Sequence, residues 1–401
     1  SIESPQENEF EILTQEDIEE IQEFKKNTNN VKKALIRSFA PNIKYMDKIK
    51  EALFLTIVSG NNSNLQIRDD IHLILIGDTG TAKSKLKEKT MDICFKSRES
   101  SGGFVSKVGL ICGISQNSFY NKPSLSKGLL PLSSVAFIEE FGNIPKEQIN
   151  DLKQALQDQY VIYRKAGFHA KMRTDCSVVV IQNPKGGCFS NDDIKKDIDL
   201  PDPILSRFDL IFKIVDNKDF DNEIFKSMAS AARGEINQKL DSEFLSKYCY
   251  HARKNFNPVV KGETEALLVR YAAKKRKKAV TGFLTRKIFN TLIRLTCANA
   301  KLRLSNKTTI QDAEESIKLI EFMHESIGIE SVDELIIGPQ KQVKSFLELA
   351  DSFKNEEGLV NLNIIKENMN NITTYRFDEI VNDLKKDGQI FEPKKGYIKR
   401  S

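Results

Sequence analysis

Residues Ile71–Ser84 read IHLILIGDTGTAKS and give the strongest fold signal in this chain. A short apolar run, Leu73 to Ile76, ends at Gly77, and Lys83-Ser84 open a segment with helical character. An apolar strand, a glycine-containing turn and a helix start form the phosphate-binding arrangement of a P-loop. The sequence therefore predicts that ATP phosphates bind at Gly77, Asp78, Thr79, Gly80, Thr81, Ala82, Lys83 and Ser84.

Two side chains of this stretch have separate predicted tasks. Lys83 would bind the β- and γ-phosphates as a point charge, and the Ser84 hydroxyl would ligate Mg²⁺. The usual pattern has Gly immediately before the lysine, whereas this chain has Ala82. The alternative is a strand-turn-helix with a structural role alone.

Composition limits the classes of protein that this chain can belong to. Its 401 residues are enough for two to three domains, and 40% hydrophobic with 29% charged residues describes a globular protein. No apolar run is long enough to cross a bilayer, so we expect an intracellular protein without a membrane partner. The net charge of +5 means that nucleic-acid binding must come from local basic clusters. The six cysteines contain no CxxC pair and are expected to be reduced core thiols.

The pattern along the chain predicts an α/β domain followed by helical and mixed units. An acidic lead-in covers 1–30, helices divided by Pro41 come next, and 31–220 forms the core. Apolar runs at 71–76, 134–139, 176–182 and 209–215 predict a largely parallel sheet. Residues 221–330 read as a helical lid, including Thr264–Lys274 and Lys287–Leu304, and Gly338-Pro339 marks a linker over 331–340.

Residues 341–401 are expected to form a small winged-helix domain. Phe377, Ile380, Val381 and Leu384 have core spacing on a helix, and Gln389 to Arg400 reads as a basic hairpin. Such modules bind DNA or dock proteins. The basic run 274–278, KKRKK, is interpreted as a solvated helix end in preference to a localisation signal or phosphate-binding patch.

Polar residues at three further strand ends complete a predicted catalytic set. Val135–Phe141, VAFIEEF, ends in Glu139, which would bind Mg²⁺, and Glu140, which would act as general base on the attacking water. Asn183, after the run VVVIQ, could orient that water. Arg207, just ahead of the fourth strand, could neutralise charge on the transferring phosphoryl group in its own or a neighbouring subunit. The alternative for Arg207 is a surface pair with Asp209.

Four segments in order, GDTGTAKS, IEEF, QNPKGG and LPDPILSRFDLIF, resemble the motor of the minichromosome maintenance (MCM) replicative helicases, a branch of the AAA+ ATPases. The resemblance covers nearly the whole chain, and Ala82 before the lysine is typical of that family. It does not include the N-terminal collar of the family, so we expect a trimmed chain or a shortened relative.

The resemblance implies a fold with an AAA+ αβα core, a helical lid and a winged helix, assembled as a hexameric ring with ATP between subunits. It assigns Lys83 and Ser84 to Walker A, Glu139 and Glu140 to Walker B, and Asn183 to the first sensor. Arg207 becomes an arginine finger acting on the adjacent subunit. The second sensor falls on Leu284–Lys287, with Lys287 where the family has Arg and Arg286 one place earlier.

Three positions depart from the family pattern. Glu139 replaces the usual Asp, Asp175 stands where the family usually has Arg, and Lys287 is a weaker bidentate phosphate ligand than Arg. These departures lead to the hypothesis of slow ATP turnover, or of an interface with rebuilt pairing.

The resemblance also places DNA contacts on two insertions, at about 108–131 and 160–176. The second, YVIYRKAGFHAKMRTDC, alternates basic and apolar residues as a hairpin would, with His169 and Arg173 among its polar residues. Lys165 in the KAG signature is the expected pore-facing phosphate contact, with Arg164 and Lys171 beside it.

The leading hypothesis is an ATP-driven DNA helicase motor that acts in replication, with DNA and replication-loading proteins as partners. It would work in an archaeal cytoplasm or a eukaryotic nucleus. The alternatives are another helix-2-insert AAA+ remodelling ATPase and a nucleotide- and DNA-binding platform that hydrolyses little.

Overall fold

The computed structural model describes residues 13–101, 107–116, 123–141, 149–165, 168–189, 197, 202–215, 221–233, 239–278, 282–327, 343, 345–355, 358–369, 374–394 and 396–400. The chain divides into two compact units, Ser1–Glu330 and Ser331–Ser401. Most of the predicted lead-in's first half and the predicted linker, 331–340, lie outside the described residues.

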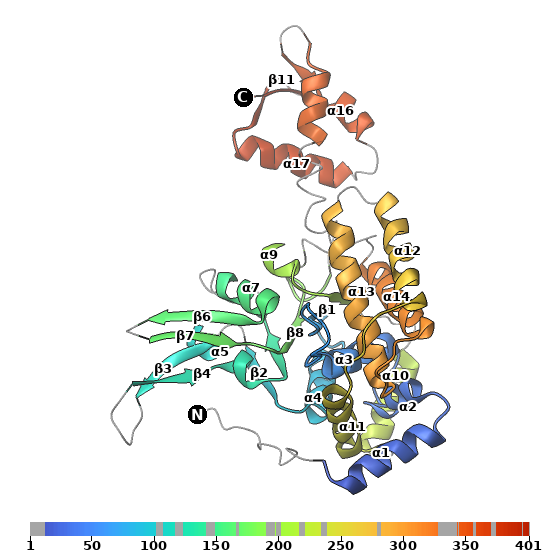
Figure 1. Ribbon diagram of the computed structural model, residues 1–401. Coiled ribbons are helices and arrows are strands. Elements are labelled where there is room, and N and C mark those ends of the chain that lie inside the picture. The colour runs from blue at the N-terminus through green and yellow to red at the C-terminus, as the bar shows by residue number, and fades with distance from the viewer. Residues whose placement is uncertain are drawn as a thin grey trace. The chain divides into compact units, whose positions relative to one another are not determined.

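Five parallel strands form the sheet at the centre of the first unit (Figure 1). They are β1 (Leu73–Gly77), β2 (Ser97–Ser101), β5 (Val135–Glu139), β8 (Ser177–Gln182) and β9 (Leu210–Ile214), in the order β2-β5-β8-β1-β9. Four of them confirm the predicted strands, with ends shifted by one or two residues. The edge strand β2 was not predicted, because its sequence SRESS has no apolar pattern.

The register of these strands brings three predicted motifs to one edge. β1 pairs with β8 so that Ile76 lies opposite Gln182, and β5 pairs with β8 so that Glu139 lies opposite Ile181. All residues of β1 and β8 are buried, as expected for parallel strands covered on both faces. The P-loop, Glu139 and Asn183 therefore all follow the carboxyl ends of neighbouring strands.

Helices that precede the sheet in sequence pack beside it. α1 (Gln15–Asn27) begins with a capping box between Thr14 and Asp17. It is followed by α2 (Val31–Ser38) and by α3 (Asp47–Val58), which is buried from Ile49 to Val58. Pro41 lies between α2 and α3, as predicted. Further core helices are α4 (Lys83–Asp92), α7 (Ile149–Asp158) and the short α9 (Asp202–Leu205).

Two antiparallel hairpins extend from the core to the same side in Figure 1. The first joins β3 (Cys112–Gln116) to β4 (Pro123–Lys127), between the short helices α5 (Lys107–Leu110) and α6 (Leu129–Leu132). The second joins β6 (Tyr160–Lys165) to β7 (Phe168–Arg173) and confirms the hairpin predicted within 160–176. Both interrupt the core sequence at the two predicted insertions.

A helical subdomain completes the first unit. It contains α10 (Asp221–Ala232), α11 (Ser242–Asn255), α12 (Glu263–Lys278), α13 (Gly282–Leu302) and α14 (Ile310–Ile327). α12 includes the predicted helix Thr264–Lys274, and α13 covers the predicted helix Lys287–Leu304 except for its last two residues. The run KKRKK forms the end of α12. Among the described residues, no helix is long and apolar enough to cross a membrane.

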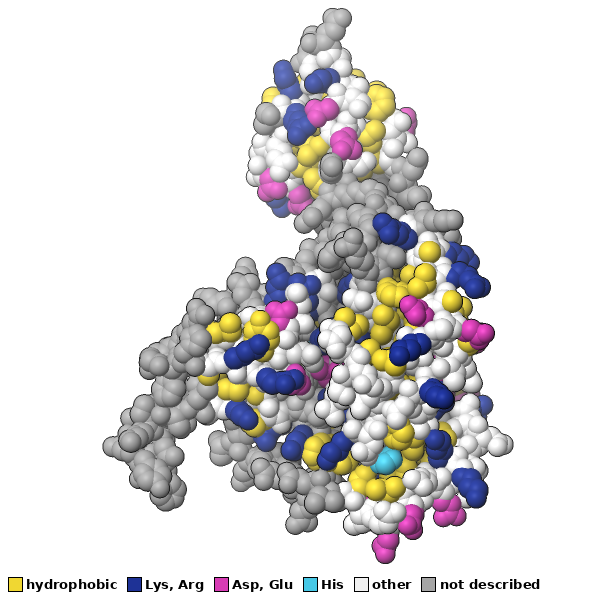
Figure 2. Space-filling view, in the orientation of Figure 1, with side chains coloured by type: hydrophobic (Ala, Val, Ile, Leu, Met, Phe, Trp, Pro, Cys, Tyr) yellow, Lys and Arg dark blue, Asp and Glu magenta, His cyan; other side chains and the backbone are white. Residues whose placement is uncertain are grey.

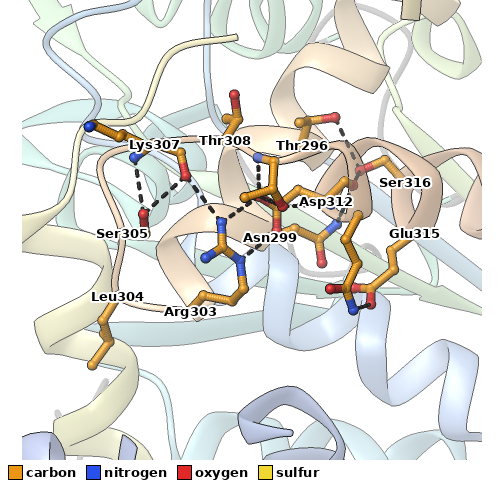
Figure 3. Close-up of polar contacts among 12 residues, drawn as sticks. Thr296, Asn299, Arg303, Leu304, Ser305, Lys307, Thr308, Asp312, Glu315 and Ser316 are labelled. Carbon is orange, nitrogen blue, oxygen red and sulfur yellow. Dashed lines mark hydrogen bonds and ion pairs between the residues drawn. The ribbon is translucent and has the colours of Figure 1, made fainter. Parts of the chain in front are cut away.

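Polar side chains fix the junction of α13 and α14 (Figure 3). Arg303 donates from Nε and Nη2 to the two carboxylate oxygens of Asp312 at 2.8 and 2.6 Å. The Asn299 Nδ2 donates to Ser316 Oγ at 3.0 Å. Bidentate pairs of this kind hold two helices in one relative orientation. The two helices also pack on the sheet region, α14 against β9 and α13 against α3.

The second unit is small and has its own core. Residues 345–352 are helical. They are followed by β10 (Val360–Asn361), α16 (Leu362–Asn368), α17 (Thr374–Lys386), β11 (Ile390–Lys394) and β12 (Tyr397–Arg400). The strands form an antiparallel sheet in the order β10-β12-β11. Phe377, Ile380, Val381 and Leu384 are buried in its core, as their spacing predicts. The α/β class with a small additional domain is thus confirmed.

Candidate nucleotide site

The P-loop lysine is enclosed by its own loop. Lys83 Nζ donates to the Gly77 carbonyl at 2.7 Å, to the Asp78 carbonyl at 2.6 Å and to Thr81 Oγ1 at 3.1 Å. The side chain is 6% exposed. Burial lowers the pKa of Lys83, and the Asp78 carboxylate opposes that shift. The three donors of this ammonium are therefore already directed at loop oxygens.

Backbone conformation gives the loop its shape. Gly80 has φ +91° and Ala82 has φ 57°, both in the left-handed region that disfavours side chains. At Gly77 an added Cβ would lie 2.8 Å from the Ile214 carbonyl of β9, so the close approach of two strands requires glycine. α4 then starts at Lys83 with no acidic residue in its first turn. The positive end of its dipole is therefore directed to the loop without a competing carboxylate.

A second loop, 183–189, supports the P-loop, a role that the sequence pattern does not predict. Thr79 N donates to the Gly187 carbonyl at 3.0 Å, and Phe189 N donates to Asp78 Oδ1 at 2.8 Å. The adjacent glycines, Gly186 and Gly187, both have positive φ and were the available signal for a tight turn. Cys188 in this loop is exposed, which corrects the expectation of core thiols, whereas the other five cysteines are buried.

The predicted acidic pair and the predicted sensor lie at the same edge of the sheet as the P-loop. Glu139 is the last residue of β5, and Glu140 follows with φ 52° while its N–H donates to the Ile181 carbonyl at 3.2 Å. A left-handed conformation at a residue with a long side chain is uncommon and is often found at functional sites. Asn183 follows β8 directly and is exposed. These three residues thus lie at the P-loop edge of the sheet, and their catalytic roles stay predictions.

Lys87 is a site residue that the sequence reasoning missed. Its ammonium lies 3.1 Å from Glu139 Oε1 and 2.5 Å from Glu99 Oε2, and the residue is 9% exposed. Burial alone would lower the pKa of Lys87, but the hydrogen bonds that its ammonium donates to Glu99 and Glu139 outweigh this effect and raise the pKa. Lys87 stands four residues after Lys83, on the same face of α4. That spacing was visible in the sequence, but its partner Glu99 lies on the unpredicted strand β2.

The oxygen donors at this edge suit Mg²⁺. Ser84 is exposed in the first turn of α4, three residues before Lys87, and Lys87 in turn contacts Glu139. A hydroxyl and a carboxylate beside a phosphate site are the hard ligands that this ion takes, with phosphates and water completing its shell. Among the described residues, no group of three His, Cys, Asp or Glu could hold a metal by itself. The ion would therefore depend on the nucleotide.

Much of this edge is open on the described chain. Thr79, Gly80, Ser84, Glu140 and Asn183 are exposed. A cavity of about 930 Å³, bordered by α1–α3 residues such as Lys33, Arg37 and Lys50, is separate, because no P-loop residue lines it. The described residues around the P-loop thus leave these groups accessible at the surface.

Arg207 lies at the opposite edge of the sheet. It precedes β9, whose last residue Ile214 is paired with Gly77 at the start of the P-loop. β9 has five residues and spans about 16 Å at ~3.3 Å per residue. The Arg207 side chain is half-buried, and burial lowers the pKa of its guanidinium, opposed by Asp158. The guanidinium therefore cannot reach phosphates on its own P-loop.

Asp209 pairs with two arginines other than Arg207, which corrects the alternative of a surface Arg207–Asp209 pair. Asp209 accepts from Arg294 Nη2 at 2.6 Å, from Arg68 Nη2 at 3.0 Å and from Thr291 Oγ1 at 2.9 Å. Burial would raise the pKa of Asp209, but Arg294 and Arg68 hold it well below its usual range. The carboxylate therefore anchors α13 to the segment that carries Arg207.

The predicted second sensor lies on this anchored helix. Lys287 is half-buried in α13, seven residues before Arg294 and hence about two turns along the same face. Arg286 is in α13 as well, but its side chain lies outside the described residues.

The three predicted DNA contacts are distributed over the β6–β7 hairpin. Arg164 and Lys165 end β6, and their side chains lie outside the described residues, as does the turn 166–167. Lys171 on β7 is exposed and places its Nζ 3.8 Å from the centre of the Tyr160 ring. On the face shown in Figure 2, the Lys and Arg side chains of the described residues are dispersed and do not gather in a single patch.

Asp175, at the departure from the family pattern, has a partner in its own chain. Arg173 Nε lies 2.7 Å from Asp175 Oδ2, and both side chains are exposed. The negative charge at this position is thus balanced by the strand that precedes it.

Comparison with known proteins gives consistent matches. A family profile described as the MCM P-loop domain matches residues 17–231, and one described as the MCM AAA-lid domain matches 243–324. The chain is 28% identical to minichromosome maintenance protein MCM of Saccharolobus solfataricus, over 96% of this chain and 59% of that protein. It is 30% identical to DNA replication licensing factor mcm4 of Schizosaccharomyces pombe, over 78% of this chain and 37% of that protein.

A third relative, an uncharacterized MCM-type protein of Methanocaldococcus jannaschii, is 29% identical over 96% of this chain and 60% of that protein. The chain therefore spans 60% or less of the length of these three relatives.

Proposed function

This chain belongs to the minichromosome maintenance (MCM) family of AAA+ ATPases, and from that premise we propose that it is the ATP-driven motor of a DNA helicase that works as a hexameric ring. Its partners would be DNA, five further subunits and replication-loading proteins. The proposed setting is DNA replication, in an archaeal cytoplasm or a eukaryotic nucleus.

One observation supports this proposal above the others: the P-loop and Arg207 lie at opposite edges of one sheet. An arginine that stabilises phosphoryl transfer must touch the transferring group. Since Arg207 is separated from its own P-loop by the length of β9, it can act only on a nucleotide held by another copy. Head-to-tail contacts of that kind close into a ring when the rotation between successive copies closes, as the proposed hexamer requires.

The proposed chemistry follows from the residues at the site. Lys83 would release loop carbonyls and bind phosphate oxygens, with the amides of the α4 N-terminus beside it. Glu140 would accept a proton from the attacking water, and Asn183 would orient that water. Mg²⁺, held through Ser84 and Glu139, would supply charge neutralisation at the phosphates. Arg207 of the neighbour would stabilise the charge of the transition state.

Mixing two inactive variants tests the shared site. We expect Lys83→Ala and Arg207→Ala each to lose ATP hydrolysis, by about 10³-fold for the arginine. In an equimolar mixture, about a quarter of head-to-tail interfaces would combine an intact P-loop with an intact Arg207, and hydrolysis should return in part. The measurement is phosphate release against protein concentration, with assembly checked by light scattering. Failure of an assembled mixture to recover activity would contradict the proposal.

A platform that binds nucleotide and DNA but hydrolyses little is a second candidate, favoured by the contact between Lys87 and Glu139. That contact engages one oxygen of the predicted Mg²⁺ ligand. DNA-stimulated hydrolysis by an assembled preparation separates the two: a clear increase with DNA supports the motor, and its absence supports the platform. A remodelling ATPase would hydrolyse ATP but would not displace the strand of a forked DNA.

A further inference from the structure

We propose that Lys87 competes with Mg²⁺ for the carboxylate of Glu139. Because of this competition, Mg²⁺ raises the nucleotide affinity of this chain only at a higher concentration than it would without that lysine. The inference rests on the proposed function, because it concerns the same nucleotide site. It assigns a regulatory task to a residue outside the P-loop and Walker B residues.

The contacts of Lys87 support this task. Its ammonium lies 3.1 Å from Glu139 Oε1, within the distance of a charged hydrogen bond, and the residue is 9% exposed. Glu139 is 34% exposed at its side chain, so its carboxylate contacts the buried lysine and is still partly accessible to solvent. A cation held against one carboxylate oxygen reduces the negative charge that this carboxylate offers to a second cation.

The position of Lys87 explains why the competition is local. Lys87 is on α4, three residues after Ser84, and side chains three apart lie on the same helix face. Its ammonium therefore enters the site from the side on which the hydroxyl ligand also stands. The longer side chain of Glu139, compared with the Asp usual in the family, extends the carboxylate toward that lysine.

Glu99 sets the strength of the competition. Its Oε2 lies 2.5 Å from Lys87 Nζ, so the lysine is shared between two carboxylates. The register of β2 with β5 places Glu99 opposite Phe137, two residues before Glu139 on the neighbouring strand. Removing the charge of Glu99 would leave Lys87 with Glu139 as its one anionic partner among the described contacts, and would strengthen that pair.

The test measures nucleotide affinity and does not depend on turnover. A fluorescent ADP analogue is titrated into the full chain in EDTA and at increasing Mg²⁺, and the Mg²⁺ concentration that gives half of the affinity gain is recorded. We expect Lys87→Met to lower that concentration by about three- to ten-fold, the effect of removing one nearby opposing charge. Glu99→Gln should raise it. Lys89→Met, which removes an exposed ion pair with Asp92 on the same helix, is the matched control and should leave it unchanged.

Each outcome decides the question. An unchanged or higher Mg²⁺ requirement in Lys87→Met overturns the inference while leaving the proposed function intact. A loss of affinity in EDTA for Lys87→Met would mean that the lysine binds phosphate directly, and also overturns it. If the unmodified chain binds no nucleotide at any Mg²⁺ concentration, the proposed function fails together with the inference. Should Lys87→Met not fold, as judged by thermal unfolding, the opposite shift in Glu99→Gln still tests the competition.

Discussion

Lys83 illustrates how single residues prepare this site. Its three loop contacts satisfy an ammonium that is almost fully buried, and they hold the loop together. Phosphate oxygens are charged acceptors and form stronger hydrogen bonds than carbonyls. In the proposed site, a bound phosphate would therefore replace neutral partners of the Lys83 ammonium by charged ones.

Glu140→Gln is expected to abolish turnover while ATP still binds. The amide keeps the size of the side chain but cannot accept the proton of the attacking water, and general-base catalysis contributes about 10²–10⁴-fold. Phosphate release measures turnover, and a fluorescent nucleotide measures affinity. The control is Glu88→Gln, an exposed carboxylate on α4. Retained hydrolysis in Glu140→Gln would exclude Glu140 as the base.

The connection between elements depends strongly on Asp209. This fully buried carboxylate joins β9 to α13 through Arg294 and to the segment before β1 through Arg68. Asp209 Oδ2 also accepts a hydrogen bond from the His72 backbone N–H at 2.9 Å, which connects the carboxylate to the main chain just before β1. Sheet and helical subdomain are thus fixed together at the start of β9, next to Arg207.

Asp209→Asn should destabilise the first unit by about 3–5 kcal/mol, because it leaves two buried guanidinium groups without their counter-charge. Urea unfolding followed by circular dichroism measures the change. Asp92→Asn removes an exposed ion pair with Lys89 and should change the free energy of unfolding by less than ~0.5 kcal/mol. Equal stabilities of the two variants would contradict the role of Asp209.

The same carboxylate predicts a dependence on pH. The pKa of Asp209 is depressed in the folded chain by Arg294 and Arg68, against the effect of burial. Its contribution to the free energy of unfolding is therefore complete above the unfolded value of about 4 and is lost as the pH falls below it. The stability difference between the unmodified chain and Asp209→Asn should narrow below that pH.

Elements whose sequence carries an apolar pattern are predictable from the sequence, and elements without such a pattern are not. Buried parallel strands such as β1 and β8 are apolar throughout and were found, whereas the half-buried β2, with its sequence SRESS, was not. Strand ends gave the places of Glu139 and Asn183. The partners of Lys87 and Asp209 depend on strand order and helix packing, which single-sequence patterns do not contain. The supporting role of loop 183–189 required tertiary contacts for the same reason.

In the first unit, two hairpins extend from the core that contains the five-stranded sheet (Figure 1). In the proposed ring, hydrolysis at one interface would move the β6–β7 hairpin relative to its neighbours. Contacts of Lys and Arg with a DNA backbone are independent of the DNA sequence, which a translocating motor requires. Such contacts weaken as the salt concentration rises.

Lys165→Ala is expected to spare ATP hydrolysis without DNA and to lose unwinding of a forked DNA. The reason is that the residue ends β6, remote in the chain from every predicted nucleotide ligand. Strand displacement and phosphate release are measured on the same preparation. Lys318→Ala, an exposed lysine on α14, serves as the control for a basic residue outside the hairpin. Unwinding at the unmodified rate in Lys165→Ala would remove the hairpin tip from the DNA path.

The place of Arg207, one strand length away from its own P-loop, has a genetic consequence. In the proposed ring, a copy with a substituted Arg207 would keep its own nucleotide site intact but would stop ATP hydrolysis at the site of the copy next to it. In a cell that makes both the variant and the unmodified protein, the variant would thus inactivate mixed rings that consist mostly of unmodified copies. Such an allele would behave as dominant, and its severity would rise with the share of defective copies per ring.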